Sequence, residues 1–257
     1  MIKLSSGFIQ IGLWQTQEKL ELVWLDEQRQ PHVLFCALPH LPTLDQCVRA
    51  NLAQHKLQRR KHYFVAAISP HQIWSKTILF PHPLSESECE AQCGLLLTQE
   101  LPISLSQLWF DYCAEQRQQG FKLTVFALQR SIAEQYLAPL SHVDVRVLDN
   151  VVYALLRAFQ FLLPDANYSK TLLLYQDTQG CIAMQKREHQ VVYIQQAIAD
   201  LNSTYTQFCQ RYPTEIESVV VYQTERISAL LPTDWTMLQT EVPLIALGNA
   251  LWHGKSD

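Results

Sequence analysis

The feature that most constrains the fold of this chain is the order of its predicted strands and helices, which appears first near the N-terminus. Apolar runs separated by polar turns predict a three-stranded meander, the spacing of apolar residues then predicts a helix, and a continuous apolar run predicts a strand buried on both faces. In chain order these segments are 7–14, 20–26, 31–37, 43–61 and 63–68. The first part of the chain is therefore expected to follow the order β-β-β-α-β.

The same order returns in the last third of the chain. Three short strands, a helix and a strand are predicted there over 171–175, 181–186, 190–194, 195–210 and 218–222. Two copies without residue identity predict an α/β fold built by duplication, of the ribonuclease-H-like kind, with two similar halves facing each other across a cleft. We place the boundary so that 1–165 forms the first half and 166–257 a shortened second half.

A smaller α/β unit is predicted between the two copies. Ser85 and Glu88 form a capping box that opens a helix, which ends before Pro102. A strand over 122–127 and a second capping box at 131–134, opening a short helix, follow. We expect these elements to form an inserted subdomain at about 74–140.

Two more elements complete the first half. Residues 143–147 alternate between apolar and polar, as in a half-buried strand. Asp149 is predicted to cap an apolar helix over 151–163, which Pro164 terminates.

Composition excludes several functions. The formal net charge is −4 and the isoelectric point about 6.1, so no overall positive field attracts a nucleic acid. The seven cysteines form no Cys-x-x-Cys pair, which indicates reduced thiols and neither a disulfide framework nor a zinc site. No signal-peptide pattern and no run of about 18 apolar residues occurs, so we expect a soluble intracellular protein.

A succession of short motifs runs through the middle of the chain and returns near its end. These are Lys76–Pro81, Leu84–Gln92, Glu100–Ile103, Phe110–Tyr112, Val125–Ala127, Val147–Asp149, Ala154–Leu155 and Ala246–Leu251. In this order they resemble the PilM family of type IV pilus assembly proteins, and the resemblance covers about two thirds of the chain. Within the family the chain is most similar to the short competence branch, the competence protein A and HofM type.

The resemblance implies an actin-like fold, with the insertion as a subdomain of the first half. It also implies a protein on the cytoplasmic face of the inner membrane that binds the short cytoplasmic N-terminal peptide of a PilN-like inner-membrane protein. Other inner-membrane alignment proteins of the pilus are further expected partners, and a homo-oligomer is possible.

The family commonly binds ATP through two Asp-x-Gly hairpins and a later Gly-Gly, because the Asp holds hydrated magnesium and glycine lets backbone N–H groups approach phosphate. In this chain the first hairpin has Gln10-Ile11-Gly12, and the second, Tyr175 to Gly180, contains no Asp-x-Gly. The place of the Gly-Gly has Tyr222-Gln223-Thr224. The chain has only seven glycines and no glycine-rich phosphate loop. We therefore expect little or no binding of ATP and magnesium, and no cofactor.

Other residues offer weaker candidate sites. His82, Cys89 and Cys93 are conceivable metal ligands, but the two cysteines continue an apolar helix face and are expected to be core. The basic run 55–62 is expected to be a solvated helix end, where cations complement the exposed carbonyls. The alternative is a binding patch, for a membrane surface ahead of DNA.

Catalysis has little support in the sequence. No serine lies in a Gly-x-Ser-x-Gly elbow, and the nine histidines have no motif around them. Asp111 and Tyr112 could form a general acid pair, although an Asp at a strand end more often caps or pairs. No catalytic and no metal-binding residue is therefore proposed.

The predicted partner site is the groove between the first half and the insertion, since an extended peptide docks where apolar pockets flank free backbone groups. The competing interpretation is that Phe80 and Leu96 belong to an inter-domain core. The residues expected at this groove are Phe80, Pro81, Leu84, Gln92 and Leu96.

The sequence thus predicts a non-catalytic adaptor of a type IV pilus or competence DNA-uptake machine. The alternative is an ATP-binding protein of the actin superfamily whose weak ATPase activity switches assembly partners. A direct DNA binder is a third hypothesis, which the charge balance does not favour.

Overall fold

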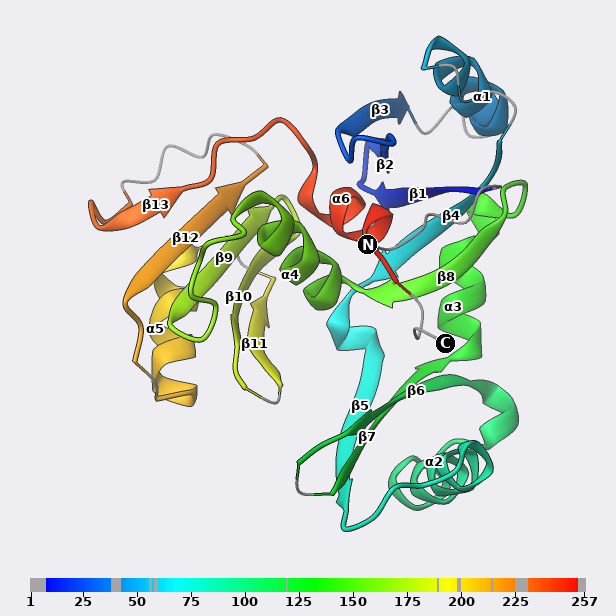
Figure 1. Cartoon of the computed structure of the whole chain (residues 1–257), viewed down its shortest axis with the longest axis vertical. Coiled ribbons are helices and arrows are strands. Elements are labelled where there is room, and N and C mark those ends of the chain that lie inside the picture. Colours follow the sequence, from blue (N-terminus) through cyan, green and yellow to red (C-terminus); the bar gives the residue numbers. More distant parts are fainter. Residues whose placement is uncertain are drawn as a thin grey trace.

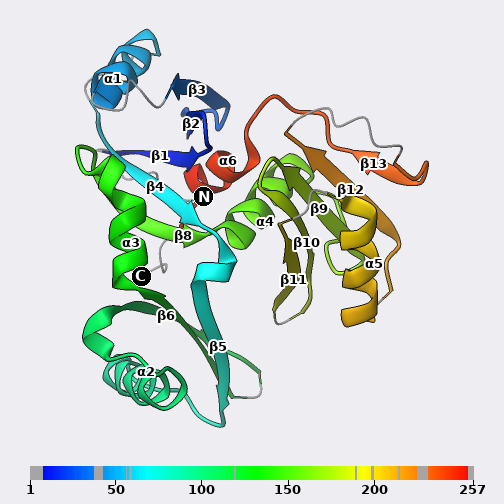
Figure 2. The same cartoon turned by 180° about the vertical axis from the view of Figure 1, so that it is seen from behind.

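The computed structural model describes residues 8–37, 43–55, 57, 60–118, 120–188, 190–197, 200–213, 215–224 and 231–253. It contains two five-stranded sheets and one three-stranded sheet. Helices α4 and α6 lie between the two larger sheets, and the smaller sheet projects from the first half (Figure 1). The view from behind shows α1 and α5 on the outer sides of their halves (Figure 2).

The first half is one five-stranded sheet with helices on both faces. Its strand order is β3-β2-β1-β4-β8, antiparallel among the first three strands and parallel from β1 through β4 to β8. Its elements are β1 (Phe8–Gln15), β2 (Lys19–Leu25), β3 (Pro31–Ala37), α1 (Leu44–Gln54), β4 (Lys61–Ile68), α3 (Arg130–Leu137), β8 (Val145–Asn150) and α4 (Val151–Leu162).

The second half repeats this topology strand for strand. Its order is β11-β10-β9-β12-β13, with antiparallel β9/β10 and β10/β11 pairs and parallel β9/β12 and β12/β13 pairs. Its elements are β9 (Thr171–Asp177), β10 (Gly180–Lys186), β11 (Val191–Gln196), α5 (Leu201–Arg211), β12 (Ser218–Gln223), β13 (Trp235–Met237) and α6 (Leu244–Ala250). The predicted duplication is confirmed, with α1 and α5 in equivalent places.

The insertion has a sheet and a core of its own. Its strands run in the antiparallel order β5-β7-β6, and α2 covers one face. The elements are β5 (Ile73–Phe80), α2 (Glu86–Glu100), β6 (Leu108–Gln116) and β7 (Phe121–Gln129), with 3₁₀ turns at Pro70–Gln72 and Leu105–Gln107. Helix α2 and strand β7 were predicted from the sequence, whereas β5 and β6 were not. Helix α3 and the 3₁₀ turn Ala138–Leu140 after it contribute to cores at the first sheet.

Apolar side chains form one continuous core between the two large sheets. Strand residues such as Trp14 and Val23 from the first half, and Tyr175 and Met184 from the second, meet the buried faces of α4 and α6. Separate cores lie under α1 and α5. The two halves are thus joined by apolar packing through α4 and α6.

Several predicted boundaries and caps are wrong. The helix expected over 43–61 ends at Gln54, because β4 begins at Lys61, and the helix expected over 195–210 begins at Leu201. The second capping box does not form, since Gln129 precedes α3 and no side chain caps it. Asn150, and not Asp149, caps α4 by accepting from the Val152 N–H at 2.9 Å.

Candidate functional site

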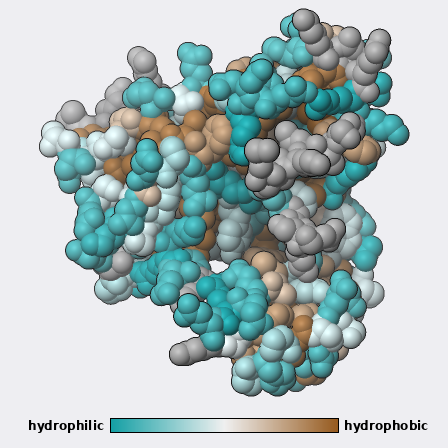
Figure 3. Space-filling view, viewed as in Figure 1, coloured by the Kyte–Doolittle hydropathy of each residue, from teal (hydrophilic) through white to brown (hydrophobic). Residues whose placement is uncertain are grey.

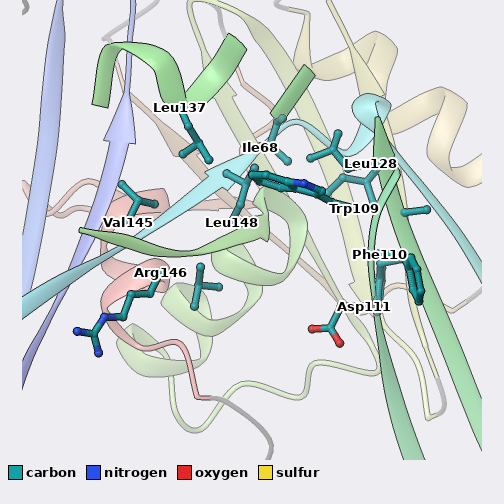
Figure 4. A pocket seen from close by; sticks show the side chains of 13 residues that line it. Ile68, Trp109, Phe110, Asp111, Leu128, Leu137, Val145, Arg146 and Leu148 are labelled. Carbon is teal, nitrogen blue, oxygen red and sulfur yellow. The ribbon is translucent and has the colours of Figure 1, made fainter. Parts of the chain in front are cut away.

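A groove of about 470 Å³ separates the edge of the first sheet from the insertion. Strands β6 and β7 form one wall, β8 forms the other, and α3 contributes Leu137 (Figure 4). In the space-filling view the insertion forms the lower end of the molecule (Figure 3). The lining residues come from six elements and are Ile68, Ile73, Trp109, Phe110, Asp111, Phe126, Ala127, Leu128, Leu137, Val145, Arg146, Val147 and Leu148.

Strand alternation explains why the wall of the insertion is apolar. Successive side chains of a strand point to opposite faces of the sheet. In β7, Leu123, Val125 and Ala127 pack toward α2, so Phe126 and Leu128 face the other way. Trp109 and Asp111 are register partners of Leu128 and Phe126 and share their face. The face that α2 leaves uncovered therefore forms the groove.

One large aromatic side chain stays exposed on the groove face of β6. Trp109 is 37% exposed there, whereas Phe110, which is 42% exposed, alternates to the other face of the strand. Among the described residues that line the groove, the only charged ones are Asp111 and Arg146. Such a surface suits a mostly apolar ligand with few polar contacts.

Both walls of the groove include a strand at the end of its sheet. Among the described strands, β6 has a neighbour only at β7, and β8 has a neighbour only at β4. An edge strand presents backbone N–H and C=O groups that an extended peptide can pair with. The groove therefore combines apolar pockets with free backbone groups.

The residues predicted for the partner site lie elsewhere in the insertion. Leu96 is in its core, Phe80 and Leu84 pack against that core, Gln92 is half-buried on α2, and Pro81 is exposed after β5. None of the five lines the groove. Phe80 and Leu96 are core of the insertion itself and not of an inter-domain contact. A role for this set in binding a partner stays a prediction.

A cavity of about 30 Å³ lies between the two halves, bordered by Trp14 and Ser69 of the first half and by Tyr175 and Gly180 of the second. Trp14 is 7% exposed and Tyr175 4% exposed. The Ser69 hydroxyl donates to Gln195 Oε1 at 3.1 Å and links the halves directly.

Gln10 stands where the first Asp-x-Gly motif of the family would begin. Its amide nitrogen donates to the backbone carbonyls of Asn249, Ala250 and Trp252 at 2.8, 3.1 and 2.9 Å, which lie at or just beyond the end of α6. Its amide oxygen accepts from the Tyr63 hydroxyl at 2.7 Å. This side chain satisfies a helix terminus, as a C-terminal cap does.

The second and third motif positions also serve local structure. Asp177 Oδ1 accepts from the Gln179 N–H at 2.8 Å and so stabilises its own turn. Tyr222 stacks on Tyr175 with ring centroids 5.9 Å apart and planes at 17°. Burial raises the pKa of Tyr222 to about 12, so its hydroxyl stays protonated and uncharged at neutral pH. Aromatic rings thus fill the region where the family has glycines.

The weaker candidates are dispersed. Cys89 and Cys93 are buried in the core of the insertion, as expected, while His82 is exposed. Tyr112 packs against that core, whereas Asp111 lines the groove, so their side chains lie on opposite faces of β6. They are not arranged as an acid pair.

The basic run 55–62 follows α1 and does not lie in its last turn, because α1 ends at Gln54 and His55 is its C-cap residue. Its role as a solvated helix end stays a prediction. Residues 56, 58 and 59 lie outside the described residues. Arg60 pairs with Glu27 at 2.5 Å, and His62 Nε2 lies 3.0 Å from Asp45 Oδ1. These two side chains thus have acidic partners within the chain.

Two sheets share one topology and face each other across α4 and α6, and the first half carries an insertion. This arrangement is an actin-like fold. No protein-family model and no curated protein matches the chain. Solved structures do match it, and the expected likeness to PilM is confirmed at the level of the fold.

The PilM-PilN type IV pilus biogenesis complex matches with a TM-score of 0.57 and 15% identity, covering 84% of this chain and 81% of the other. The cytoplasmic domain of EpsL, an inner membrane component of the type II secretion system of Vibrio cholerae, matches with a TM-score of 0.54 and 14% identity, covering 95% and 94%. A protein with an actin-like ATPase fold from Bacteroides thetaiotaomicron has a TM-score of 0.46 and 9% identity, covering 89% and 86%.

None of the helices in the described part of the chain combines the length and the apolar character needed to cross a bilayer.

Proposed function

We propose that this chain is a non-catalytic adaptor of a type IV pilus or competence DNA-uptake machine. It binds the cytoplasmic N-terminal peptide of a PilN-like inner-membrane protein in the groove between β6, β7 and β8. The observation that carries the proposal is this apolar groove with its two unpaired strand edges. The chain would then sit on the cytoplasmic face of the inner membrane, held there by its partner and by other alignment proteins of the pilus.

The groove fits an extended peptide better than a compact ligand. A peptide strand can pair its backbone with β6 or β8 and place alternate side chains against Trp109, Phe126 and Leu148. Burial of apolar side chains then supplies most of the affinity, at about 25 cal/mol per Å² before the cost of ordering the peptide.

The structural comparisons support this class of function. The structure that matches with a TM-score of 0.57 is a complex of PilM with PilN. The one that matches with a TM-score of 0.54 is the cytoplasmic domain of an inner-membrane component. Both resemble this chain over more than four fifths of its length. A shared fold does not by itself transfer a partner, so the peptide requires its own test.

We infer that the adaptor works without nucleotide. Trp14 and the stacked pair of Tyr175 and Tyr222 occupy the cleft between the halves, and Gln10 is committed to the end of α6. The alternative, an actin-superfamily ATPase that switches partners, requires ATP and magnesium to bind the folded chain. Binding at 100 times the dissociation constant would stabilise the native state by about 2.7 kcal/mol. Thermal unfolding with and without millimolar ATP and magnesium decides between the two, and a clear rise in Tm would favour the ATPase.

The peptide itself is tested by isothermal titration of the full chain with the N-terminal peptide of a PilN-like protein from the same organism. We expect saturable binding that Trp109→Ala weakens about tenfold or more, because an exposed aromatic at the centre of an interface is a typical hot spot. Trp109 is 37% exposed, so its removal leaves the core intact.

Two variants control this titration. Leu95→Ala removes another exposed apolar side chain, 53% exposed on α2, and is expected to leave binding unchanged. Pro81→Ala probes the site predicted from the sequence. If Pro81→Ala abolishes binding and Trp109→Ala does not, the partner uses that other site and the groove proposal fails.

A further inference from the structure

The two charged side chains of the groove differ in what surrounds them. Arg146 Nη2 lies 2.8 Å from Asp144 Oδ2, and its guanidinium stacks over the rings of Phe8 and Tyr63, 4.9 and 5.0 Å from their centroids. Its charge and its planar face are thus already engaged. In Figure 4 its guanidinium points away from Asp111.

Among the described residues, Asp111 has no such partner. Its Oδ1 accepts from the Tyr112 backbone N–H at 2.8 Å, and no Lys, Arg or His of the described chain lies within ion-pair distance of it. The carboxylate stands beside Trp109 on the groove face of β6 and points toward the space between the walls (Figure 4). Its other oxygen has no hydrogen-bond donor in the part of the chain that the structure describes, and it can accept from a ligand.

We propose that the partner segment carries a lysine or arginine side chain that pairs with Asp111 while its apolar neighbours cover Trp109. This inference rests on the proposed function and adds a rule of specificity to it. A cation within reach of both groups gains a charge-assisted hydrogen bond to the carboxylate and the attraction of the indole face. An acidic residue at the same place meets a like charge and is disfavoured.

The test selects peptides from a phage-displayed library of random dodecapeptides on the immobilised full chain. Peptides that bind the wild type but not the Trp109→Ala variant are classed as groove-dependent. We expect one position in them to be enriched in lysine or arginine. A parallel selection on Asp111→Lys is expected to enrich aspartate or glutamate at that position.

A double-mutant cycle then measures the pair directly. The binding of one selected peptide, and of its form with glutamine at the basic position, is compared on the wild type and on Asp111→Asn. The asparagine oxygen can still accept from the Tyr112 N–H, so only the charge is lost. We expect each single change to weaken binding about two- to fivefold, as an exposed ion pair does, and the double change to add little more. Added salt should weaken binding only between the wild type and the basic peptide, because only that combination has both charges.

Each other outcome is decisive. Groove-dependent peptides without a basic position, or changes that are additive in the cycle, overturn the Asp111 rule and leave the adaptor proposal standing. A library that yields no binder sensitive to Trp109→Ala overturns the groove as a peptide site, and the specificity rule falls with it.

Discussion

Arg157 bridges Asp149 at the end of β8 to α6. Its Nη2 donates to Asp149 Oδ2, and its Nε donates to the Gly248 carbonyl at 2.9 Å. The two charged side chains are 24% and 16% exposed, so solvent screens them only in part. Because α4 and α6 lie between the two large sheets, this bridge ties the first sheet to the centre of the molecule.

Replacing Arg157 with methionine should lower the free energy of unfolding by about 1–3 kcal/mol. The change leaves the partly buried Asp149 carboxylate and the Gly248 carbonyl without their donor. Urea unfolding followed by circular dichroism measures the loss. Arg49→Met is the control, because the Arg49–Asp45 pair is 70% and 40% exposed and should contribute less than about 0.5 kcal/mol. Equal effects of the two substitutions would contradict a structural role for the bridge.

Gly248 is required by the crossing of α4 and α6. A Cβ built there would lie 1.8 Å from the Ala154 carbonyl oxygen, which is backbone and cannot rotate away. We expect Gly248→Ala to cost about 3 kcal/mol or more, since the helices must separate. Gly94→Ala tests the opposite case, because the nearest atom to its Cβ is Leu105 Cδ1 at 3.8 Å and alanine favours the helix by up to about 1 kcal/mol. Thermal unfolding that shows the same sign for both would refute this account.

Periodicity was enough to predict the duplicated fold. Each half has its own strand alternation and its own amphipathic helix, and those signals are local in sequence. The insertion was harder to predict, because β6 carries Trp109 and Asp111 on a face that is open to solvent and the exposed Phe110 on its other face. Without full burial on either side, the strand lacks the clear alternation that identifies it. The groove residues were missed for the same reason, and only the pair of neighbouring exposed aromatics gave a signal.

Capping boxes show how a short motif depends on its context. Ser85 accepts from the Glu88 N–H, and the Glu88 carboxylate accepts from the Ser85 N–H at 2.7 Å. The same spacing at Ser131 lies inside α3, which begins at Arg130, so Ser131 does not occupy the N-cap position. We expect Ser85→Ala to cost about 1 kcal/mol and Ser131→Ala to change stability by less than about 0.5 kcal/mol. Chemical denaturation of the two variants checks this, and a larger loss at Ser131 would show that the cap forms there after all.

Glu21 gives the fold a dependence on pH. It is 8% exposed on β2, and burial raises its pKa above the ordinary 4.5, with Lys19 at 3.4 Å acting against the shift and the like charge of Asp177 adding to it. Because the native state then binds the proton more tightly than the unfolded chain, the contribution of Glu21 to stability falls as the pH rises above about 4.5. The penalty is complete once the pH exceeds the folded-state pKa.

Glu21→Gln should therefore raise the Tm at pH 7, and the gain over the wild type should shrink as the pH falls toward 4.5, where the native carboxyl is protonated. Scanning calorimetry of both proteins between pH 4.5 and 8 measures the difference. Glu18→Gln serves as the control, because Glu18 lies in the exposed turn before β2 and the charge that it loses is not buried. If Glu21→Gln lowers the Tm throughout this range, the ion pair with Lys19 outweighs the cost of burying the carboxylate.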